Sequence, residues 1–84
     1  MTASAAERIR TLIDVASKKS SASGRTLDLA QVYVTVLVRC GICREDATQL
    51  VADNDQDPIS RILHFAGDSH NFAVLAVEEA LAAA

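Results

Sequence analysis

The stretch Thr26–Gly41, TLDLAQVYVTVLVRCG, decides the fold, because its pattern fits two kinds of secondary structure. As a strand, it alternates valines with mostly polar residues and has a β-branched content that suits a sheet. As a helix, it repeats apolar residues every three or four positions and leaves one narrow polar edge. That apolar stripe consists of Leu29, Val32, Tyr33, Val36, Leu37 and Cys40. No other segment alternates convincingly, and a lone strand would leave its backbone groups unpaired. We therefore predict a helix over residues 27–40, apolar most of the way round and central in the fold.

Capping residues and helical periodicity predict further helices on both sides of this stretch. Ser4 and Glu7 form an S-x-x-E capping box, and the basic segment KKSSASGR at 18–25 reads as a flexible loop. Asp57 followed by Pro58 is typical of a helix start, and the glycine after Ala66 is typical of a helix end. The predicted helices span about 5–18, 27–40, 44–53, 58–66 and 69–82. The fold class expected is all-α: one domain, residues 1–84, forming a compact bundle of four to five short helices.

Composition and charge limit the kinds of protein that this chain can be. Half of the 84 residues are hydrophobic and only three are aromatic, so the core must be aliphatic. The net charge of -3 is unevenly placed: residues 1–42 carry +3, whereas residues 43–84 carry -6. No apolar run reaches the roughly 18 residues that a membrane span needs, and no signal peptide is recognisable, so we expect a cytoplasmic protein without a membrane partner.

The two cysteines and two histidines raise the question of a metal site. Cys40 and Cys43 form a C-x-x-C, and His64 and His70 follow after twenty residues. Zinc binds two thiolates and two imidazoles in a tetrahedron. In an up-and-down bundle, the corner that holds the cysteines would lie at the same end as the corner that holds the histidines. The alternative is structural: Cys40 ends one helix on its buried side, and Cys43 begins the next helix as an imperfect cap. We expect no cofactor, and zinc remains the alternative.

A helix-turn-helix is a second alternative, since residues 44–66 contain two short helices joined by a turn. The second of these helices offers few groups to DNA, chiefly Arg61, and three aspartates precede it. Those aspartates would repel phosphate, so nucleic acid is an unfavoured partner. Enzyme chemistry also has little basis, because the sequence contains neither a glycine-rich phosphate loop nor paired carboxylates in an obvious cleft.

The function expected from these features is that of a small acidic adaptor, regulator or inhibitor that binds another protein. The last predicted helix is apolar on more sides than a terminal helix of so small a bundle can bury. The chain also offers acidic side chains that complement a basic surface, such as that of a nucleic-acid-handling protein or of a second copy in a homodimer. The expected contact residues are Glu45, Asp46, Asp53, Asp55, Asp57, Val74, Leu75 and Leu81.

Overall fold

The stretch that decides the fold is helical in the computed structural model, which describes residues 4–53 and 57–83. Helix α2 spans Leu29–Arg39 and begins where the Asp28 carboxylate accepts a hydrogen bond from Gln31 N at 3.2 Å. It ends at Cys40, and Gly41 then turns the chain with a φ of 101°, a value that favours glycine. The prediction of a helix is confirmed, and no strand occurs in the described residues.

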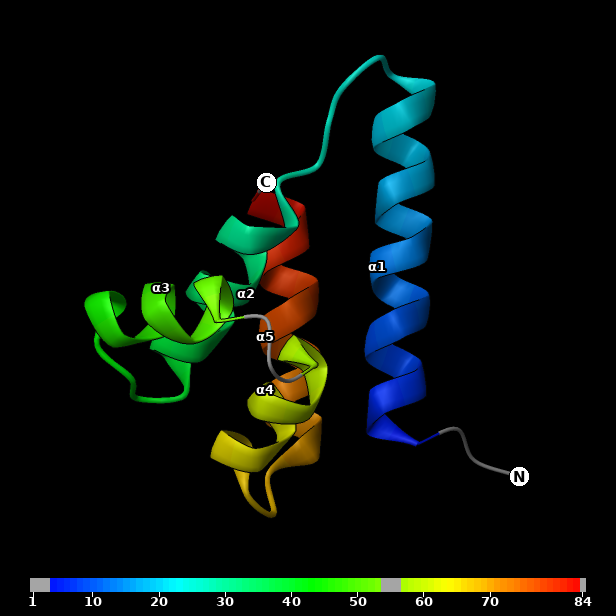
Figure 1. The fold of residues 1–84 in the computed structure, drawn as a ribbon. Coiled ribbons are helices and arrows are strands. Elements are labelled where there is room, and N and C mark those ends of the chain that lie inside the picture. The colour runs from blue at the N-terminus through cyan, green and yellow to red at the C-terminus, as the bar shows by residue number, and fades with distance from the viewer. Residues whose placement is uncertain (1–3, 54–56, 84) are drawn as a thin grey trace.

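The described residues form an all-α bundle, as predicted (Figure 1). Its helices are α1 (Ala5–Ala22), α2 (Leu29–Arg39), α3 (Arg44–Ala52), α4 (Pro58–Ala66) and α5 (His70–Ala83). No helix among these residues is both long enough and apolar enough to cross a membrane.

The helices are arranged around α2, which packs against α3, α4 and α5. Helix α1 packs against α5 and α4 instead of against α2, its neighbour in the sequence. Figure 1 shows α1 and α5 running in the same direction, while α3 projects from the opposite side of the bundle. This arrangement differs from a simple up-and-down bundle, in which neighbouring helices in the sequence lie side by side.

The core is aliphatic, as the composition requires. Its buried members are Ile9, Ile13, Val32, Val34, Val36, Leu37, Ala47, Ile59, Ile62, Ala73, Val74, Ala76, Val77 and Ala80. Val34 lies outside the predicted apolar stripe of α2 and is nevertheless only 6% exposed. A helix that packs against three others is covered on several sides, so the central position of α2 explains why Val34 is buried.

Local sequence signals account for most of the helix ends. Ser4 Oγ accepts a hydrogen bond from Glu7 N at 3.2 Å and so caps α1. Pro58 opens α4 directly after its N-cap residue, Asp57, and Gly67 ends α4 with a φ of 61°. Cys43 occupies the N-cap position of α3, but its side chain makes no capping hydrogen bond. The prediction that Cys43 is an imperfect cap is therefore confirmed.

The end of α1 differs from the prediction, because the helix continues beyond residue 18 to Ala22. Lysine and serine tolerate a helix, and Lys18 forms an ion pair with Asp14 one turn earlier, with Nζ and Oδ2 3.1 Å apart. The first strong helix breaker is Gly24, which adopts a φ of 73°. Helix α1 therefore extends through most of the segment expected to be a loop.

Candidate functional site

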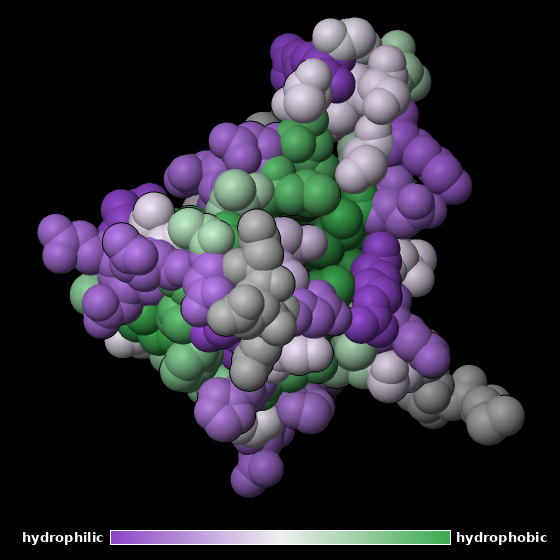
Figure 2. Space-filling model, in the orientation of Figure 1, coloured by the Kyte–Doolittle hydropathy of each residue, from purple (hydrophilic) through white to green (hydrophobic). Residues whose placement is uncertain are grey.

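A groove lies between α3, the corner that joins α2 to α3, and the last turn of α4. We call it the α3 groove. It has a volume of about 840 Å³ and is lined by Gly41, Ile42, Cys43, Asp46, Gln49, Leu50, Ala52, Asp53 and Phe65. It forms because α3 projects away from the bundle and packs mainly against α2 (Figure 1). In Figure 2, hydrophilic side chains cover most of this projecting part, and a hydrophobic area lies along its lower edge.

The apolar part of the α3 groove consists of Ile42, Leu50 and Phe65. Ile42 and Leu50 are half-buried and pack against the core. Phe65 is 42% exposed, so a large part of its apolar surface is not covered by the rest of the chain. Its ring contacts the ring of His64 edge to face, with the centroids 5.3 Å apart. Part of the Phe65 ring thus faces solvent without a covering side chain.

The polar part of the α3 groove is acidic. Asp46 belongs to the first turn of α3, and Asp53 follows the last turn. Glu45 and Asp46 are exposed and form no ion pair within the described part of the chain. Asp53 lies 3.8 Å from Arg61, measured from Oδ2 to Nη2, and the Arg61 side chain is only 15% exposed. The groove therefore presents carboxylates to solvent, with the mostly covered guanidinium of Arg61 beside Asp53 and the exposed side chain of Arg44 near Asp46.

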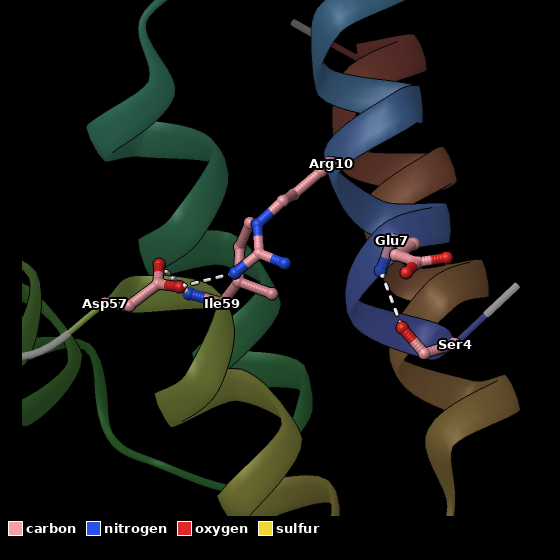
Figure 3. A network of polar contacts seen from close by, with 5 residues as sticks. All are labelled: Ser4, Glu7, Arg10, Asp57 and Ile59. Carbon is pink, nitrogen blue, oxygen red and sulfur yellow. Dashed lines mark hydrogen bonds and ion pairs between the residues drawn. The ribbon is translucent and has the colours of Figure 1, made fainter.

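Asp57, expected to bind a partner, makes contacts within the chain (Figure 3). Its Oδ1 accepts a hydrogen bond from Ile59 N at 3.1 Å and caps α4, and its Oδ2 lies 2.9 Å from Arg10 Nη2. Burial raises the pKa of the Tyr33 hydroxyl, and the negative charge of Asp57 raises it further. The carboxylate of Asp57 therefore joins α1 to α4 and lies close enough to influence α2. Asp55 lies outside the described residues.

The three apolar residues expected at a partner surface have different environments. Val74 is 3% exposed and belongs to the core, because α5 packs against three helices and buries more of its surface than a terminal helix was expected to. Leu81 is half-buried against the core. Leu75 is 56% exposed, the largest fraction among the exposed large hydrophobic residues. The structure thus corrects the interpretation of Val74, and of the three residues only Leu75 is exposed.

The cysteines and histidines of the proposed zinc set are not brought together. Among residues 4–53 and 57–83, no group of three or more His, Cys, Asp or Glu side chains could hold a metal ion. The expectation assumed an up-and-down bundle, whereas α3 projects away from the bundle (Figure 1). His64 and His70 are exposed on α4 and α5 and do not line the groove that holds Cys43. Cys40 is half-buried, and burial raises the pKa of its thiol, while Cys43 is exposed at the groove.

Helices α3 and α4 do not form a helix-turn-helix unit. In that motif the two helices pack against each other so that the second is presented to the major groove. Here α3 packs against α2, and α4 packs against α1, α2 and α5, with no extensive α3–α4 contact among the described residues. Arg61, the main group that α4 could offer to phosphate, is mostly buried next to Asp53. The geometry therefore gives no support to the DNA-binding alternative.

The sequence reasoning missed the apolar half of the α3 groove. Phe65 carried a usable signal, because it lies outside the apolar stripe of its helix, where a large aromatic side chain has no core position to fill. Ile42 and Leu50 carried none, since their partial exposure depends on how α3 is placed against α4. A comparison with family models, curated proteins and solved structures gives no match for this chain.

Proposed function

We propose that this chain is a protein-interaction module whose α3 groove binds a segment of a partner protein that carries large apolar side chains beside lysine or arginine. The observation that carries the proposal is the position of the exposed Phe65 ring opposite half-buried Ile42 and Leu50, next to exposed carboxylates. Apolar anchors surrounded by polar groups are typical of protein contact surfaces. The role that follows is that of a small adaptor, regulator or inhibitor.

The apolar half of the groove would supply most of the affinity. A phenylalanine buries roughly 200 Å² when it is fully covered, so covering the exposed fraction of Phe65 would contribute about 2 kcal/mol. Ile42 and Leu50 add a smaller area to the same contact. Binding energy in protein interfaces is commonly concentrated in a few such anchors.

The acidic half of the groove would select the charge of the partner. Asp46 lines the groove and Glu45 lies beside it in the first turn of α3. Neither forms an ion pair in the described part of the chain, so a basic side chain need not displace an internal partner. Residues 43–84 carry a net charge of -6, and this excess would also attract a basic segment before contact. A lysine or arginine that ends near Asp46 would place its aliphatic carbons on the apolar half of the groove.

We propose binding and not catalysis, because the described lining does not combine a nucleophile with a histidine base. Cys43 is the nucleophile of the described lining, and no histidine is present among those residues to accept its proton. The proposed role therefore does not require Cys43 to react. A Cys43→Ser variant of the protein should bind the same partner segment.

The proposal can be tested by selecting short random peptides for binding to the purified protein. We expect the enriched peptides to combine lysine or arginine with leucine, isoleucine, methionine or aromatic residues. Phe65→Ser should weaken their binding by about tenfold or more, consistent with losing a central anchor. Phe72→Ser is the matched control, because Phe72 is also 42% exposed but does not line the groove.

A second pair of variants tests the charge requirement. Asp46→Lys should weaken the selected peptides, whereas Asp68→Lys, an exposed aspartate outside the groove, should not. Selection of acidic peptides would contradict the proposal. So would equal losses from the groove variants and their controls, provided that all variants keep the helical circular dichroism of the parent protein.

A further inference from the structure

A second surface of the chain is formed by α1 and α5, which lie side by side and run in the same direction (Figure 1). We call it the α1–α5 face. It contains two shallow hollows of about 320 and 290 Å³. The first is lined by Arg8, Thr11, Leu12, Val74 and Glu78, and the second by Leu12, Val15, Ala16, Lys19, Glu78, Leu81 and Ala82. Because they share Leu12 and Glu78, the hollows form one continuous surface.

Two exposed apolar side chains accompany these hollows, one on each helix. Val15 of α1 is 45% exposed and lines the second hollow. Leu75 of α5 is 56% exposed, and it precedes Glu78 by three positions and Ala82 by seven, so it lies on the same side of α5 as they do. The face therefore combines two projecting apolar side chains with two hollows.

We propose that the α1–α5 face binds a second copy of this chain, with α1 of each copy lying over α5 of the other. The two-fold axis of this dimer runs parallel to the helices. In such an isologous contact each surface patch meets itself, so its charges and shapes must be self-complementary. The proposal does not depend on the α3 groove, which lies on other helices.

The charges of the face favour this arrangement. The α1 edge carries Arg8 and Lys19, three turns and about 16 Å apart, and the α5 edge carries Glu78. Lys19 and Glu78 form no ion pair within the described residues. With the axis parallel to the helices, the basic edge of one copy lies over the acidic edge of the other. With the axis across the helices, α1 would lie over α1 and bring Arg8 against Lys19, which is repulsive.

The shapes are compatible with the same arrangement. Leu75 and Ala82 are seven residues apart on α5, and Glu78 and Glu79 lie between them. Four residues at this spacing surround a hole, which in helix packing receives one side chain, the knob, of the facing helix. Val15 of the second copy, which lies at the level of Glu78, is the side chain placed to fill it. Leu75 of the second copy, in turn, lies at the level of the first hollow, beside Thr11 and Leu12.

Light scattering on the purified chain, from micromolar to millimolar concentration, tests the proposal directly. The mass should rise with concentration from that of one chain of 8.9 kDa to that of two. Leu75→Gln should shift the midpoint to at least tenfold higher concentration. Phe65→Gln, which changes an exposed apolar side chain of α4 away from the α1–α5 face, should not shift it. A parent protein that remains monomeric at the highest concentration would overturn the proposal.

A charge exchange tests the geometry of the dimer. Lys19→Glu and Glu78→Lys should each form a dimer roughly 30-fold weaker, because two symmetric pairs change from attraction to repulsion. Mixing the two variants should restore dimers, since each contact then again joins opposite charges. Misfolding cannot produce that recovery. If the single variants weaken the dimer and the mixture does not recover, Lys19 and Glu78 do not meet and the assigned axis is wrong.

Discussion

Asp57 links the N-terminus of α4 to α1, so its replacement by alanine should destabilise the fold measurably. The Asp57→Ala change removes the cap on Ile59 N, which is worth about 1 kcal/mol. It also removes the ion pair with Arg10. In this pair the Arg10 side chain is 54% exposed and the Asp57 side chain is 42% exposed. Exposure on that scale limits the pair to about 0.5 kcal/mol. The loss of unfolding free energy should therefore be about 1.5 kcal/mol, which corresponds to a Tm lower by about 6 to 12 °C for a chain of this size.

Two further variants separate the contributions of Asp57. Asp57→Asn keeps a good capping side chain and loses only the charge, so it should cost about 0.5 kcal/mol, and Arg10→Met should cost about the same. Thermal unfolding followed by circular dichroism at neutral pH measures all three, and added salt should reduce only the contribution of the ion pair. If Asp57→Asn destabilises the chain as much as Asp57→Ala, the capping role assigned to Asp57 is refuted.

Two other predictions concern α3 and α2. Cys43→Ser should raise the free energy of unfolding by about 1 kcal/mol, because serine can make the capping hydrogen bond that Cys43 lacks. An unchanged Tm would show that the side chain at this position does not cap α3. The pKa of Tyr33 should lie above its ordinary value of 10.0 and fall partly towards it in Asp57→Asn, as measured by ultraviolet absorbance. Since folding raises this pKa, the contribution of neutral Tyr33 to stability is complete below about pH 10 and is lost as the pH rises through the folded value. An ordinary pKa for Tyr33 would contradict its burial next to Asp57.

The sequence predicted those features that depend on residues close together in the chain. The caps at Ser4 and Asp57 and the turn at Gly67 follow from local backbone chemistry, and each lies where the pattern indicated. The helical identity of α2 needed one global argument, which was that a single strand has no pairing partner. The extra turn of α1 shows the limit of local rules, because serine and lysine weaken a helix without ending it.

The candidate contact surfaces were harder to predict, because they depend on how helices are placed against each other. Val74 and Leu75 are neighbours of similar apolarity, yet packing buries the first and leaves the second open. Asp57 and Asp46 are both acidic residues at helix N-termini; the capping position of Asp57 is a local feature, but its ion pair with Arg10 of a distant helix is not. Predicting the α3 groove would have required the orientation of α3 relative to Phe65, and no local sequence pattern contains that orientation.

The packing of α1 has a consequence for how the chain acquires its fold. Helix α1 is synthesised before α4 and α5, the helices against which it packs. Its apolar side, which includes Ile9 and Ile13, has few partners until α4 and α5 are available. Joining the two ends requires closure of a long loop, which is entropically costly and tends to be slow. During synthesis, the newly made protein therefore keeps the apolar side of α1 exposed until α5 has formed, and only then is its core complete.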